Sequence, residues 1–116
     1  MNKYLKFKDY GPVGGDCTGP VYFELVGNPT VKELADSIIS DDKEWGYIGI
    51  YDKAASPNGF GSVFGNPYIE YRYGQYVDEN YNPIEFNFPE KISNSLVKEV
   101  KASGGWSRMD WLFVIK

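Results

Sequence analysis

The chain has 116 residues, a length typical of one globular domain spanning 1–116. Its net charge of −4 and its two arginines argue against nucleic-acid binding, which needs clustered basic side chains. The absence of histidine removes the commonest general base and metal ligand, and the lone Cys17 excludes an intrachain disulfide.

The clearest local signal is a helix at about residues 30–40. Its apolar residues recur with the spacing of one helical face, and they are Val31, Leu34, Ala35, Ile38 and Ile39. Thr30 and Glu33 form a T-x-x-E capping box, in which each side chain accepts a hydrogen bond from a backbone N–H of the other residue. The sequence therefore predicts an amphipathic helix that begins just after Thr30.

Strands are predicted on both sides of this helix, at 21–26 and 45–52. In the second strand Ile48 and Ile50 share one face, and Tyr47 and Tyr51 share the other. The connection is long enough for a parallel crossover, and its length also permits an antiparallel return. The pairing of these two strands is left open.

Further strands are predicted before and after this central unit. Residues 3–8 are typical of a short edge strand, whose lysines discourage pairing with another molecule. Alternating or extended patterns predict strands at 60–64, 68–73 and 84–88, with turns at Asn58-Gly59 and Gly74-Gln75.

The segment 89–102 has two interpretations. It is either one helix, or a short helix near 89–95 followed by a strand that pairs through Gly104-Gly105 with 109–115; we favour the second. The run 111–115 is apolar on both faces, which predicts a central strand covered on both sides. The expected fold class is α+β, with one amphipathic helix on a mostly antiparallel sheet of five to seven strands.

Aromatic residues form the first candidate binding surface. The chain has ten tyrosines, and we select Tyr47, Tyr51, Tyr71 and Tyr73 together with Arg72 because they lie at alternating or adjacent strand positions. Tyrosine gives large contact area at low entropic cost and has a polar tip. The alternative is that these rings simply fill the second face of a sheet that has few helices.

The second candidate is the segment 103–110, which contains Trp106 and Arg108 beside two glycines. Tryptophan and arginine are frequent interface anchors, and glycine allows a ligand to approach the backbone. The alternative is a hairpin turn in which Trp106 covers the core and Arg108 pairs with Asp110 or another carboxylate.

We expect a small cytoplasmic binding protein without catalysis, for example a regulator, an inhibitor or a ligand-sequestering protein, including one from a phage or mobile element. Its partner is expected to be a protein or a small molecule, with homo-oligomer formation left open. No catalytic residue, metal site, cofactor or membrane segment is predicted. The alternative is a small enzyme that works with carboxylates and tyrosines.

Overall fold

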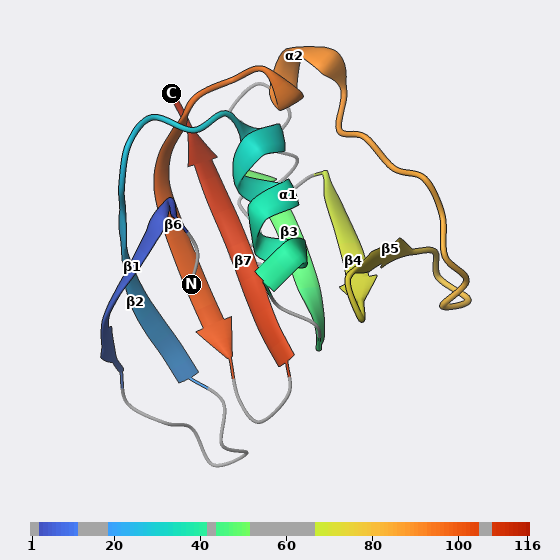
Figure 1. The fold of residues 1–116 in the computed structure, drawn as a ribbon, viewed down its shortest axis with the longest axis horizontal. Helices are drawn as coiled ribbons and strands as arrows, with labels where there is room; N and C mark the ends of the chain where they lie inside the picture. The colour runs from blue at the N-terminus through green and yellow to red at the C-terminus, as the bar shows by residue number, and fades with distance from the viewer. Residues whose placement is uncertain (1–2, 12–18, 42–43, 52–66, 105–107) are drawn as a thin grey trace.

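The computed structural model describes residues 3–11, 19–41, 44–51, 67–104 and 108–116. These form a mixed α and β fold with one seven-stranded sheet and two helices (Figure 1). The strands are Leu5–Tyr10 (β1), Gly19–Leu25 (β2), Trp45–Tyr51 (β3), Tyr68–Arg72 (β4), Gln75–Val77 (β5), Val97–Gly104 (β6) and Arg108–Ile115 (β7). The helices are Val31–Asp41 (α1) and Glu90–Ser93 (α2).

The order of strands across the sheet is β1-β2-β6-β7-β3-β4-β5. Every neighbouring pair is antiparallel except β3 with β7, which is parallel. Because β2, β7 and β3 therefore share one direction, the connection through α1 is a crossover between two parallel strands that are not neighbours. The strands before and after α1 are therefore parallel, an orientation that the length of the connection alone did not determine.

Helix α1 packs on one face of the sheet, in front of β7 and β3 (Figure 1). Its buried residues Val31, Leu34, Ala35 and Ile38 join Ile48, Ile50 and Phe113 in one core. Burial of each large apolar side chain contributes about 1.5–3 kcal/mol. The capping box is confirmed: the Thr30 N–H donates to Glu33 Oε1 at 3.0 Å, and the Glu33 N–H donates to Thr30 Oγ1 at 3.2 Å.

The C-terminal part of the fold follows the favoured interpretation of 89–102. Helix α2 is one short turn, and β6 then pairs antiparallel with β7. The Ser93 hydroxyl donates to the Phe88 carbonyl at 2.8 Å, which fixes α2 against the segment that precedes it. Strand β7 is central, as predicted, but Leu112 and Val114 on its second face are only half-buried.

Two local predictions are wrong. The turn between β4 and β5 consists of Tyr73 and Gly74, with φ of 52° and 81°, and not of Gly74-Gln75. Positive φ at both central residues is the requirement of a type I′ hairpin turn, and glycine is favoured at its second position. Residues 84–88 form no strand: the Ile84 N–H donates to the Tyr76 carbonyl beside the Val77–Pro83 bridge, but no strand ladder continues through 84–88.

Several predictions concern residues outside the described ranges: Cys17, Asn58-Gly59, the strand at 60–64 and Trp106. Neither helix in the described part of the chain has the length and apolar character required to cross a membrane.

Candidate binding surface

Two rows of side chains lie side by side on the sheet face opposite α1. In the first row, Trp45 of β3 is paired with Arg72 of β4 on one side and Arg108 of β7 on the other. In the second row, Tyr47 is paired with Glu70 and with Asp110 in the same two strands. We call these six residues the arginine–aromatic grid.

The pleat of the strands explains why these residues share a face. Successive side chains of a strand point to opposite faces, and residues two apart point to the same one. Ile48 and Ile50 of β3 are fully buried on the side of α1, so Trp45 and Tyr47 face the other way. The same alternation in β4 and β7 brings an arginine and a carboxylate to each side of the β3 aromatics.

Stacking holds the guanidinium groups against the rings. The Arg72 guanidinium carbon lies 4.8 Å from the Trp45 ring centroid and 4.2 Å from that of Tyr81. The Arg108 guanidinium carbon lies 4.8 Å from the Trp45 ring and 4.9 Å from the Tyr47 ring. Each such contact contributes about 0.5–1 kcal/mol when exposed and about 2 kcal/mol when desolvated. Both arginines of the chain are therefore ordered on Trp45.

Each arginine is also fixed at its Nε atom by a carboxylate two residues away. Arg72 Nε donates to Glu70 Oε2 at 2.6 Å, and Arg108 Nε donates to both carboxylate oxygens of Asp110 at 2.9 and 3.0 Å. The side chains of Glu70 and Asp110 are 10% and 11% exposed, whereas those of Arg72 and Arg108 are 30% and 34% exposed. The carboxylates thus lie deeper than the cations that they hold.

The electrostatics of the grid follow from this layering. Burial raises the pKa of Asp110, and the Arg108 hydrogen bond and charge oppose that shift. Burial also raises the pKa of the Tyr47 phenol, and the charge of Glu70 and its hydrogen bond with Tyr47 add to the effect. The Glu70 hydrogen bond raises the pKa of Arg72. The Arg72 guanidinium is therefore fully charged at neutral pH.

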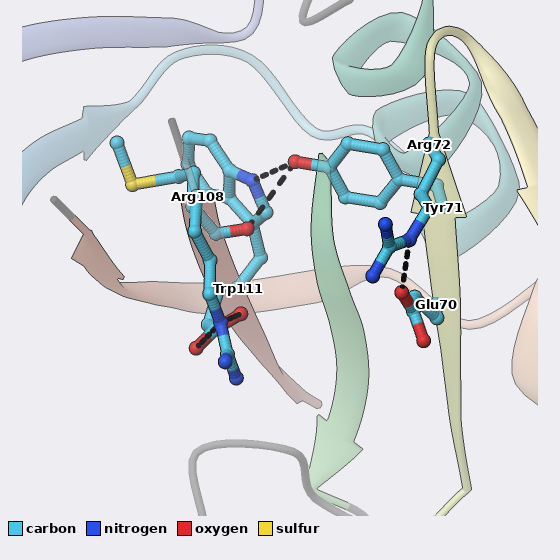
Figure 2. A network of polar contacts seen from close by, with 7 residues as sticks. Glu70, Tyr71, Arg72, Arg108 and Trp111 are labelled. Carbon is cyan, nitrogen blue, oxygen red and sulfur yellow. Dashed lines mark hydrogen bonds and ion pairs between the residues drawn. The ribbon is translucent and has the colours of Figure 1, made fainter. Parts of the chain in front are cut away.

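A second network fastens the same three strands on the face covered by α1 (Figure 2). The Tyr71 hydroxyl donates to the Met109 carbonyl at 3.2 Å and accepts a hydrogen bond from Trp111 Nε1 at 3.2 Å. The Tyr71 side chain reaches from β4 across β3 to β7 because Gly46 lies beneath it. A Cβ atom at Gly46 would overlap the Met109 carbonyl oxygen and lie 3.0 Å from the Tyr71 hydroxyl.

The structure brings together three of the residues selected from sequence: Tyr47, Arg72 and Arg108. Tyr51 lies on the same face, at the far end of β3, and is partly exposed. Tyr73 lies in the β4–β5 turn and is largely exposed. Tyr71 was placed wrongly: its side chain is fully buried in the core, because the Gly46 gap accepts its ring.

Sequence reasoning did not select Trp45, Glu70 and Tyr81 as site residues, and it considered Asp110 only as a structural partner of Arg108. That Arg108–Asp110 pairing is confirmed. The spacing of Glu70 with Arg72, and of Arg108 with Asp110, is a signal that could have been used, because residues two apart in a strand share a face. Nothing in the sequence indicated that both pairs flank Trp45.

In the described ranges, no three acidic or cysteine side chains gather closely enough to hold a metal ion. Comparison of the chain with protein-family models, with curated proteins and with solved structures finds no match.

Proposed function

We propose that the protein is a non-catalytic binding protein whose arginine–aromatic grid docks a partner protein. The observation that carries this proposal is the stacking of both arginines of the chain on Trp45, each held at Nε by a carboxylate that is less exposed than the arginine. Arginine, tryptophan and tyrosine are the residue types that dominate binding energy at protein interfaces.

Ordering of the grid before binding supports this role. Arginine side chains lose about 0.5–1.5 kcal/mol of rotamer entropy each when an interface immobilises them. Here the stacked rings and carboxylates already restrict both side chains, so less of this loss would accompany docking. Tyr68 and Tyr51 extend the same face with partly exposed rings, and the Tyr68 ring lies 6.0 Å from that of Tyr47. The surface thus combines fixed anchors with broad aromatic area.

We favour binding over catalysis because of how the two carboxylates are engaged. Glu70 of β4 and Asp110 of β7 lie on either side of Tyr47 in β3. Two carboxyl groups near one another are also the arrangement of a catalytic acid–base pair. Each one, however, accepts a hydrogen bond from a guanidinium group at 3.0 Å or less, which engages the carboxylate with its own arginine. Acid–base catalysis instead needs a carboxyl group within reach of a substrate, and these two side chains lie beneath their arginines with only 10% and 11% of their surface exposed.

The proposal is tested with Arg72→Lys, which keeps the charge beside Glu70 but removes the planar group stacked on Trp45 and Tyr81. Partners are captured from lysate on the wild-type protein and identified, and the affinity of each is then measured by calorimetry. We expect Arg72→Lys to lower the affinity for the true partner by about tenfold or more, while the melting temperature stays close to that of the wild type.

The control is Lys32→Ala, an exposed residue of α1 on the covered side of the sheet, which should leave the affinity unchanged. Equal affinities of wild type, Arg72→Lys and Trp45→Phe for every captured protein would reject the grid as the docking surface. Native mass spectrometry could instead detect a small molecule that the wild type retains and the same variants lose. That result would show that the grid binds a small ligand and not a protein.

A further inference from the structure

The two edge strands of the sheet, β5 and β1, differ in whether another segment of the described chain pairs with their outer side. At the β5 edge, the following segment covers the strand: Val77 forms a bridge with Pro83, and the Asp78 N–H donates to the Asn82 carbonyl at 3.0 Å. Strand β1 lies at the opposite end of the sheet (Figure 1) and pairs only with β2 among the described residues. In the part of the chain that is described, β1 is thus the edge with no covering segment.

The backbone groups that face this edge can be assigned from the ladder. The Val26 N–H donates to the Tyr4 carbonyl, so Tyr4 faces β2, and alternation makes Lys6 face β2 as well. The N–H and C=O groups of Leu5 and Phe7 then point away from β2. Beyond them, Lys8 is the extra residue of a bulge.

The far end of the edge is closed by the chain itself. The Asp9 carboxylate accepts a hydrogen bond from the Tyr10 N–H at 2.8 Å, which satisfies that donor. The open part of β1 therefore runs from Leu5 to Lys8, a length suited to a short extended segment of another molecule.

The side chains along β1 combine positive charge with exposed rings. Lys6 and Lys8 are exposed, and Lys3 lies just before the strand. Phe7 is 44% exposed and Tyr10 is 70% exposed, with ring centroids 4.8 Å apart. Lysines alone would be explained as protection of an edge against aggregation. An exposed aromatic pair works against such protection, because it offers apolar contact to an incoming strand.

We propose that an acidic extended segment of a partner protein adds to β1 as an eighth strand. Leu5 and Phe7 supply the backbone hydrogen bonds, Lys6 and Lys8 attract carboxylates, and Phe7 packs against the apolar residues between them. Lysine repulsion disfavours a second copy of β1 and any basic strand, so the same charges that prevent self-pairing select the partner. This site is independent of the arginine–aromatic grid.

The test uses a fluorescein-labelled peptide of alternating glutamate and valine, with an alternating lysine–valine peptide of equal length as control. We expect the acidic peptide to bind with an affinity that falls as salt rises, and the basic peptide not to bind. In wild-type protein, the amide protons of Leu5 and Phe7 should gain protection from hydrogen exchange on peptide addition, and that of Lys6 should not change.

Charge reversal then separates strand addition from general attraction. Lys6→Glu with Lys8→Glu should weaken the acidic peptide by about tenfold or more, whereas Lys98→Glu with Lys101→Glu, exposed on β6, should change it less than twofold. Absence of binding at about 1 mM peptide, or binding without protection of Leu5 and Phe7, would overturn the proposal. Tighter binding of a labelled oligothymidylate than of the peptide would overturn it in favour of single-stranded nucleic acid.

Discussion

The two faces of β3, β4 and β7 cover their aromatic side chains with different chemistry. On the face covered by α1, Tyr71 and Trp111 are buried, and the Trp111 N–H donates a hydrogen bond to the Tyr71 hydroxyl. The surrounding residues are apolar. On the other face, Trp45 and Tyr47 are half-buried and are covered by guanidinium groups. Burial supplies the stability of the first face, whereas stacking and ion pairs order the second face while leaving its cations accessible.

This difference teaches where substitutions should affect folding and where they should affect binding. Apolar burial is nearly independent of partner and pH, and its loss leaves a cavity. Partly exposed ion pairs contribute little to stability, typically 0–1 kcal/mol, but they fix the direction of a charged group. The covered face should therefore respond to mutation mainly through unfolding, and the grid mainly through affinity.

The largest expected contrast lies between adjacent residues of β7. Phe113 is fully buried under α1, and Leu112 is half-buried on the grid face. Phe113→Ala should lower the free energy of unfolding by about 3–5 kcal/mol. Leu112→Ala should cost less than half as much, because part of its surface already contacts water. Chemical denaturation of both variants measures the contrast, and equal losses would show that the two faces are equally buried.

The next effect concerns Gly46. Gly46→Ala should destabilise the fold by about 1–3 kcal/mol or more, because the new Cβ overlaps the Met109 carbonyl and forces β3 away from β7. Tyr71→Phe should cost about 1–3 kcal/mol, since the buried Trp111 N–H loses its acceptor.

A double-mutant cycle sharpens this test. The two losses should not add in the variant that carries both changes, because both disrupt one network. Additive losses would mean that Gly46 and Tyr71 act independently.

The smallest effects are pH effects on one tyrosine of each face. Burial, with a contribution from Asp36, raises the pKa of Tyr76 on the covered face to about 12, and burial and Glu70 raise that of Tyr47 on the grid. A raised pKa favours the neutral phenol in the folded state. The stability it contributes is present below the ordinary pKa of 10.0 and is lost as pH rises through the folded value.

Denaturation between about pH 9 and pH 12 measures this loss. Tyr76→Phe should reduce the alkaline loss of stability. In protein labelled at the tyrosine ring carbons, Glu70→Gln should lower the pKa of Tyr47 and leave that of Tyr76 unchanged. A shift of both tyrosines, or of neither, would show that Glu70 does not act locally on the grid.

Sequence by itself determined the features that depend on neighbouring residues. The helix follows from the spacing of Leu34 and Ile38 and from the Thr30–Glu33 capping box, which are satisfied within one or two turns of chain. The separation of Ile48 from Tyr47 follows from the pleat of a strand. The pairing of β6 with β7 could also be predicted from sequence, because a hairpin joins segments that are close along the chain.

Only the tertiary structure decided which strands became neighbours. Trp45 meets Arg72 and Arg108 because β3 is inserted between β4 and β7, an order that no local pattern encodes. Tyr71 looked like a surface ring because tyrosine suits either face of a strand. Its burial depends on the space above Gly46, which exists only once β3 lies beside β7. Local periodicity sets the direction of a side chain, and long-range packing sets what that side chain meets.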